Sequence, residues 1–161
     1  MAESSSAPRG NVSPEKYDGK YGHTFYYAFN LLKLGDKESW TFREEFSTDC
    51  PVWPSSWLCE VVFRKVLDDG HVFVPITLKR TDIAGQPLKI RIETYINDEV
   101  NDRDFMFDAP PTEKGGILGG HELKDIIIKH LPSPEERERF NRKLHIKFFI
   151  YVSSCHKTWE K

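Results

Sequence analysis

The chain has 161 residues, of which 39% are hydrophobic and 13% aromatic, and its 23 basic and 25 acidic residues leave a formal net charge of −2. This length and this supply of large side chains suit one domain with one core, and they exclude a chain that is disordered throughout. The near-zero net charge excludes a chain-wide field for nucleic acid or anionic lipid, and no apolar run reaches the roughly 18 residues of a membrane-spanning helix.

The first segment, residues 1–22, is rich in Ser, Pro, Gly and charged residues and has little apolar area, so we expect a flexible N-terminal tail. Its polar start, Met1–Ser6, carries no export or anchoring signal, which predicts an intracellular protein of the cytoplasm or nucleus. In these compartments Cys50, Cys59 and Cys155 are expected to be reduced thiols.

From Thr24 onward, apolar and polar residues alternate in segments separated by Gly, Asp and Pro, which is typical of half-buried β-strands. In chain order, the predicted strands lie at about residues 24–34, 40–46, 57–64, 72–78, 88–96, 105–107 and 144–152. Asp68-Asp69-Gly70 predicts a tight hairpin turn between the third and fourth strands, because Gly tolerates positive φ. Pro75 cannot donate a backbone hydrogen bond, so the fourth strand is expected at a sheet edge or with a bulge at this residue.

Two short helices are predicted late in the chain, after a loop at residues 108–120. The segment from His121 to His130 has apolar residues at helical spacing, although its three consecutive isoleucines leave a strand as the alternative. Ser133 followed by Pro134 has the pattern of a capped helix start. The sequence therefore predicts a mainly β protein, an antiparallel sandwich or barrel-like sandwich of seven to eight strands with one or two short helices. The domain is expected to span residues 23–153, and a C-terminal tail residues 154–161.

The sequence carries no motif of a catalytic or cofactor site. Structural zinc sites take ligands in closely spaced pairs, whereas Cys155 and His156 are adjacent and His121 and His130 are nine residues apart, so we expect no metal site. There is no Gly-x-Ser-x-Gly elbow, and the Gly-rich stretch 114–120 lacks the Gly-Lys-Ser/Thr ending of a phosphate loop. We expect no enzyme and no cofactor. Sequence leaves open that a cysteine meets a histidine in space, with Cys59 expected in the core and Cys155 in the tail.

Several segments resemble the MATH domain, the meprin and TRAF homology or TRAF-like fold. They are Trp40-Thr41-Phe42-Arg43, Trp57-Leu58-Cys59-Glu60-Val61, a central strand from Val72 to Leu78 with its partner from Leu88 to Asn97, Phe105-Met106-Phe107 before a Gly-rich loop, the helix-like Glu122-Leu123-Lys124-Asp125, and a closing strand from Leu144 to Val152. The resemblance covers about four fifths of the chain. It implies an eight-stranded antiparallel sandwich that recognises short peptides, as a recruiting or scaffold module in ubiquitin pathways or receptor signalling.

The sequence therefore predicts a non-enzymatic adaptor that binds a peptide segment of a partner protein on a sheet face, by main-chain pairing with pockets for alternate side chains. The candidate binding residues are Phe73, Phe105, Phe107, Ile117, Leu118, Lys114 and His71. Gly116-Ile117-Leu118 stands where adaptor-type relatives carry an aromatic-Gly-aromatic cluster, so the family's peptide preference does not transfer.

Two alternatives stay open. A C2-like or other β-sandwich binder would use the acidic loops at Asp68-Asp69 and at residues 98–104 for calcium. A nucleic-acid-binding module would use the basic segment 137–147, although interleaved acidic residues at 135, 136 and 138 disfavour it. The sequence does not define the oligomeric state.

Overall fold

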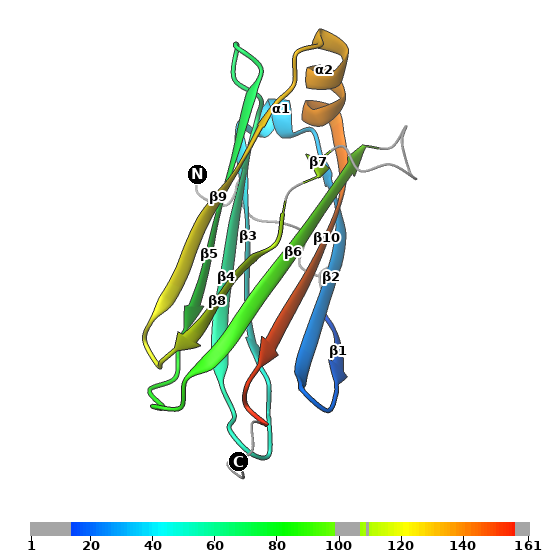
Figure 1. Cartoon of the computed structure of the whole chain (residues 1–161). Helices are drawn as coiled ribbons and strands as arrows, with labels where there is room; N and C mark the ends of the chain where they lie inside the picture. The colour runs from blue at the N-terminus through cyan, green and yellow to red at the C-terminus, as the bar shows by residue number, and fades with distance from the viewer. Residues whose placement is uncertain (1–13, 99–106, 109, 157–161) are drawn as a thin grey trace.

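The computed structural model describes residues 14–98, 107–108 and 110–156, and in it two antiparallel sheets pack face to face with two short helices at one end (Figure 1). In chain order the elements are β1 (Glu15–Asp18), β2 (Gly22–Leu32), α1 (Leu34–Lys37), β3 (Ser39–Ser47), β4 (Ser56–Arg64), β5 (His71–Arg80), β6 (Leu88–Asp98), β7 (Phe107–Asp108), β8 (Thr112–Ile117), β9 (Glu122–His130), α2 (Pro134–Arg142) and β10 (Lys143–Ser153). The predicted antiparallel β-sandwich is confirmed, with ten strands in the described residues where seven to eight were predicted.

One sheet has six strands in the order β1-β2-β10-β6-β7, with β8 also pairing with β6, and the other has four in the order β3-β4-β5-β9. We call them the six-stranded and the four-stranded sheet. β10, the last strand among the described residues, lies between β2 and β6, where Phe148 pairs with Tyr27 on one side and Thr94 on the other. The six-stranded sheet is therefore complete only when this C-terminal strand has entered it.

An aromatic layer between the two sheets forms the centre of the core. Strict alternation along β10 directs Phe148 inward, where its ring centroid lies 4.9 Å from Phe42 and 6.2 Å from Phe63 of the opposite sheet. Phe29 of β2 stacks on Phe42 with centroids 5.2 Å apart. Such ring pairs add about 0.5–1.5 kcal/mol each beyond the burial of their area, so this layer joins the sheets.

The helices close one end of the sandwich. α2 begins as predicted: Ser133 is its N-cap, and the Ser133 hydroxyl accepts a hydrogen bond from the Glu135 amide at 3.1 Å. At its other end, the Asn141 side chain accepts a hydrogen bond from the Val66 amide at 3.1 Å. The predicted second helix is confirmed, and it ties the β4–β5 turn to the start of β10.

The segment predicted as the first helix, residues 121–130, is instead strand β9. β9 pairs with β5 along its whole length, from Glu122 opposite Lys79 to His130 opposite His71. This pairing satisfies backbone groups along an edge of β5, and the three β-branched isoleucines suit a pleated surface better than a helix. Tertiary pairing therefore overrides the helical spacing of the apolar residues.

Two segments predicted as irregular also contain strands. β1 lies within the predicted tail, residues 1–22, and pairs with the start of β2. β8 lies within the predicted loop 108–120 and pairs with β6. All four residues of β1 are exposed, so backbone hydrogen bonds rather than buried side chains hold it, and alternation gives no signal there. Cys155, predicted to belong to the C-terminal tail, is buried.

The hairpin turn predicted before β5 is confirmed, since Gly70 has a φ of +91° and its amide bonds to the Leu67 carbonyl at 2.8 Å. Pro75, in contrast, lies inside the four-stranded sheet, because β5 has β4 on one side and β9 on the other. The pairing between β4 and β5 ends with Val61 opposite Ile76. Pro75 is the next residue toward the turn and lies beyond the last residue pair between β4 and β5. The backbone N–H that proline lacks is therefore not needed for pairing with β4.

Two adjacent phenylalanines of β10 test this core. Phe148→Ala should lower the free energy of unfolding by about 3–5 kcal/mol, because it empties the aromatic layer between the sheets. Phe149→Ala, on the outer face of the same strand, should cost only about 1 kcal/mol, since Phe149 is half-buried against Tyr26 and Tyr95. Urea unfolding of both variants checks the pair, and equal losses would contradict the inward position of Phe148.

Candidate functional site

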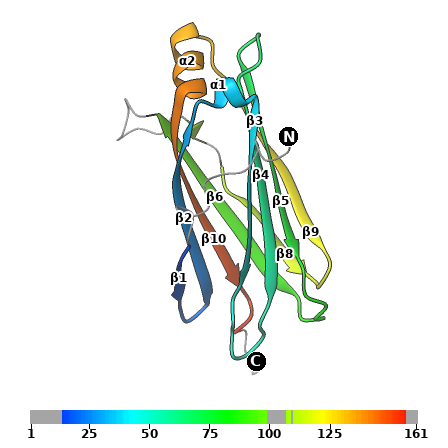
Figure 2. The same ribbon diagram turned by 180° about the vertical axis from the view of Figure 1, so that it is seen from behind.

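β5 and β9 run side by side in the four-stranded sheet (Figures 1 and 2). An apolar patch lies on the outer face of these two strands. Phe73 lies opposite Ile128, and Pro75 lies opposite Ile126. Ile126 and Ile128 are 44% and 57% exposed, while Phe73 and Pro75 are half-buried. We call these four residues the outer β5–β9 patch. Neighbouring apolar side chains in contact with water mark a surface whose covering is favourable.

One edge of β9 borders this patch and pairs with no strand among the residues that the structure describes, because β9 ends the order of the four-stranded sheet, although β8 of the other sheet lies close to β9. Asp125 shields part of this strand: its carboxylate accepts hydrogen bonds at 2.8 Å from the Ile126 amide and at 2.8 Å from the Thr112 hydroxyl. An open strand edge beside an apolar patch offers main-chain and side-chain contacts together.

Polar side chains close the patch at the end next to the β4–β5 turn. The rings of His71 and His130 have centroids 4.7 Å apart. The Asp69 carboxylate accepts a hydrogen bond from the His71 amide at 3.0 Å and lies 3.2 Å from the His71 Nδ1. The amide and the imidazole of His71 hold the pKa of Asp69 below its ordinary value. The patch therefore has one polar end.

Among the predicted binding residues that the structure describes, His71 and Phe73 come together at the same end of β5, with ring centroids 6.0 Å apart. Ile117 is buried, which corrects its predicted role as a surface contact. Leu118 is half-buried in a turn at the opposite end of β9, where its carbonyl accepts from the His121 amide at 3.0 Å.

The three further predicted residues are Lys114, Phe105 and Phe107. Lys114 is exposed, but it lies on β8 of the six-stranded sheet. Phe105 lies outside the described residues, and Phe107 is placed only as part of β7, opposite Ile96. The described members of the predicted set therefore do not form one surface, because they come from two sheets and from both ends of the sandwich.

Sequence reasoning missed Ile126 and Ile128 as surface residues because the helix prediction placed Ile126 on a buried face. The signal was the run of three isoleucines: in a strand, the first and third share one face and the second lies on the other. Ile127 accordingly packs against the core while its two neighbours are exposed.

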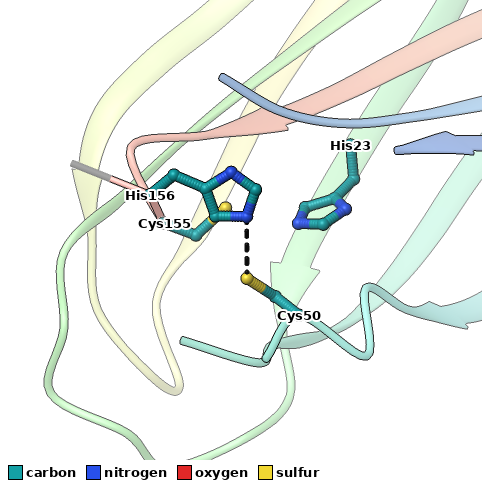
Figure 3. Close-up of side chains that lie close together, drawn as sticks. All are labelled: His23, Cys50, Cys155 and His156. Atoms are coloured by element: carbon teal, nitrogen blue, oxygen red, sulfur yellow. Dashed lines mark hydrogen bonds between the residues drawn. The ribbon is translucent and has the colours of Figure 1, made fainter. Parts of the chain in front are cut away.

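A second cluster lies at the end of the sandwich opposite the helices, where four potential metal ligands meet (Figure 3). His23 comes from the start of β2, Cys50 from the loop after β3, and Cys155 and His156 from the segment after β10. One ligand atom from each lies within 4.8 Å of all the others. The His156 Nε2 and the Cys50 Sγ are hydrogen-bonded at 3.1 Å. We call these residues the Cys/His cluster.

The two thiols of the Cys/His cluster have different acidities. Burial alone would raise the pKa of Cys50, but the amides of Trp53 and Val52 and the nearby imidazoles of His23 and His156 lower this pKa to about 6. Burial and the neighbouring Cys50 raise the pKa of Cys155 to about 11. A hydrogen bond to the Lys20 carbonyl and the nearby Cys50 sulfur raise the pKa of His156. Cys50 is therefore the more acidic thiol.

Sequence reasoning predicted no metal site because the ligand spacing is unusual. Two of the four residues are adjacent, and the other two are separated from them and from each other by long stretches of chain. The strand order brings them together: β10 pairs with β2, so Val152 lies opposite His23 and the chain after β10 continues past the start of β2. A local sequence motif cannot indicate a site whose ligands come together only through strand pairing.

The alternatives from the sequence gain no specific support. At the loop considered for calcium, the Asp69 carboxylate already accepts a hydrogen bond from His71. In the basic segment, Arg137 donates to the carbonyls of Leu131 and Pro132 at 2.8 and 3.1 Å. Both alternatives stay predictions.

Comparisons with known proteins give no family for this chain: no protein-family model matches it, and a search of curated proteins finds no significant match. Of the two helices in the described residues, neither has the length and apolarity to cross a membrane.

The three isoleucines of β9 test the geometry of the patch. Ile126→Thr and Ile128→Thr should each change the free energy of unfolding by no more than about 0.5 kcal/mol, because both side chains are exposed. Ile127→Thr should cost about 1–2 kcal/mol, because its hydroxyl would lie against the core. Urea unfolding of the three variants measures these changes. Equal losses of unfolding free energy at Ile126 and Ile127 would indicate that both side chains lie on one buried helical face, and they would contradict the assignment of this segment to strand β9.

Proposed function

We propose that this chain is a protein-interaction module without catalytic activity, which binds a short extended segment of a partner protein along the outer β5–β9 patch. The observation that carries the proposal is the pair of exposed isoleucines, Ile126 and Ile128, on a strand with one edge that pairs with no strand in the described part of the chain. Either feature alone is common on protein surfaces. Together they match what a peptide requires when it binds by adding a strand to a sheet.

The binding mode follows from the geometry of β9. A segment that pairs with its open edge would receive main-chain hydrogen bonds, which supply affinity regardless of sequence. Every second side chain of the segment would lie on the outer face of the sheet, beside Ile126 and Ile128. We expect the bound segment to carry apolar residues at alternate positions and to place a polar residue near His71 and His130.

Asp125 sets a condition on this mode. Its carboxylate accepts from the Ile126 amide, so this bond must break if the incoming strand uses that amide. A carboxylate on an edge strand also opposes pairing between two copies of the same edge, as charged residues do in many sheets. The proposal therefore favours a different protein as partner over a second copy of this chain.

The resemblance to the TRAF-like fold supports the same function. Without the four-residue β1 and the two-residue β7, eight strands are left, four in each sheet, which is the strand number that the resemblance implies. The helix-like segment of the resemblance differs, since it is part of β9. The proposal includes a role as a recruiting or scaffold module in ubiquitin pathways or receptor signalling. It also includes an intracellular location, which the three free cysteines in the described residues favour.

Selection from a displayed library of random peptides tests the proposal. The wild-type chain should select peptides with alternating apolar residues, and the double variant Ile126→Thr/Ile128→Thr should bind them at least about tenfold more weakly. Ile83→Thr is the matched control, because Ile83 is 97% exposed and lies in the loop after β5, away from the patch. This control should bind the peptides as the wild type does.

Two results would overturn the proposal. The first is equal binding of the selected peptides by the wild type and the double variant, which would locate the site elsewhere. The second is a wild-type dimer in analytical ultracentrifugation that the double variant loses, because the patch would then be covered by a second copy of the chain.

A further inference from the structure

The Cys/His cluster contains one polar atom that the fold leaves without a partner. His23 is only 3% exposed, and its Nε2 has no hydrogen-bond partner among the described residues. Its other ring nitrogen, Nδ1, lies 2.7 Å from the Asp18 carboxylate. A carboxylate only accepts hydrogen bonds at neutral pH, so Nδ1 carries a proton, and in the neutral ring Nε2 presents a lone pair to the buried space. An unsatisfied buried acceptor is costly unless something binds it.

His156 is oriented in the same way from the other side of the cluster. Its Nδ1 lies 3.0 Å from the Lys20 carbonyl, which can only accept, so Nδ1 is again the donor. Its Nε2 points to the Cys50 sulfur at 3.1 Å (Figure 3). Histidines that bind metal commonly donate the remote N–H to a carboxylate or a carbonyl, which fixes the ring and the tautomer. Asp18 and Lys20 provide these two acceptors.

From this arrangement we infer that the His23 Nε2, the Cys50 Sγ, the Cys155 Sγ and the His156 Nε2 bind one Zn²⁺ ion in tetrahedral coordination. Two thiolates and two imidazoles are a usual ligand set for structural zinc. Ligand atoms around such an ion lie roughly 3.3–3.8 Å apart, given bonds of about 2.3 Å to sulfur and about 2.1 Å to nitrogen. The four atoms already lie within 4.8 Å of one another, so the widest separation needs to shorten by about 1 Å, while the 3.1 Å between the Cys50 Sγ and the His156 Nε2 needs to lengthen by roughly 0.5 Å.

A disulfide between Cys50 and Cys155 is the competing chemistry for the same residues. It would use the two sulfurs, but it would leave the Nε2 atoms of both histidines without a role. In particular, it gives no partner to the buried Nε2 of His23. Zinc accounts for all four side chains and for the two acceptors behind the histidines.

The role of the ion would be structural. All four coordination positions are filled by protein side chains, which leaves none for water or substrate. The ligands belong to the start of β2, the loop after β3 and the end of the chain after β10, so the ion would tie the six-stranded sheet to the four-stranded sheet. It would do so at the end opposite the helices, apart from the outer β5–β9 patch (Figure 1). The inference does not depend on the proposed function.

Metal titration of the full chain, purified and kept reduced, tests the site. Zn²⁺ should bind at one equivalent, survive dialysis and raise the midpoint of thermal unfolding. Co²⁺ in its place should give the intense visible absorption of tetrahedral cobalt together with a thiolate-to-cobalt charge-transfer band. The two bands report the geometry and the sulfur ligands separately from any effect on stability.

Three variants complete the test. His156→Asn removes a half-buried ligand, and far-ultraviolet circular dichroism should show it folded with zinc affinity lowered more than about 100-fold. Asp18→Asn removes only the acceptor behind His23 and should lower the affinity by about 10- to 100-fold. Cys59→Ala is the matched control, since Cys59 is a buried cysteine of β4 outside the cluster, and it should leave zinc binding unchanged.

Three outcomes would overturn the inference. One is a reduced wild-type chain that binds no zinc at one equivalent. Another is zinc binding that the folded His156→Asn variant retains at wild-type affinity. The third is cobalt absorption without the thiolate charge-transfer band, because the metal would then sit on ligands other than the two cysteines.

Discussion

Packing of aromatic rings between the two sheets fixes the inward and outward direction of β2, β3, β4 and β10. Phe148 contacts rings of both sheets, so a one-residue shift of β10 would carry it to the outer face and leave a void. The register of β10 in turn sets those of β2 and β6, which pair with it on either side. Because side chains fill the space between the sheets, a binding site can lie only on the outer faces or at the two ends of the sandwich.

Both candidate sites are consequences of this arrangement. In the four-stranded sheet, the alternation that buries Val72 and Val74 turns Phe73 and Pro75 outward. β9 pairs with β5 beside these residues, and its own alternation places Ile126 opposite Pro75 and Ile128 opposite Phe73 on the same outer face. At the end opposite the helices, the pairing of β10 with β2 carries the residues after β10 to the start of β2, where the Cys/His cluster forms. One site is thus a sheet face, and the other is a junction between the start of β2, the loop after β3 and the segment after β10.

The sequence predicted those parts of the fold that side-chain burial determines. Long strands such as β4 and β10 alternate strictly because one face of each is in the core, and alternation is visible in a single sequence. β1 escaped notice because its residues are exposed, and β9 was misassigned because its apolar spacing fits a helix as well as a strand. The choice at β9 depends on the open edge of β5, which no local pattern contains. The Cys/His cluster was missed for a related reason: its ligands meet only through the strand order, and adjacency of Cys155 and His156 gave no metal motif.

Amide hydrogen exchange, measured with and without a library-selected peptide, tests the central claim most directly. If the peptide adds a strand beside β9, exchange should slow at amides between Leu123 and Lys129 and at the facing residues of β5, while β2 and β10 stay unchanged. Slower exchange confined to the six-stranded sheet, with β9 unaffected, would contradict a binding surface on the outer β5–β9 patch.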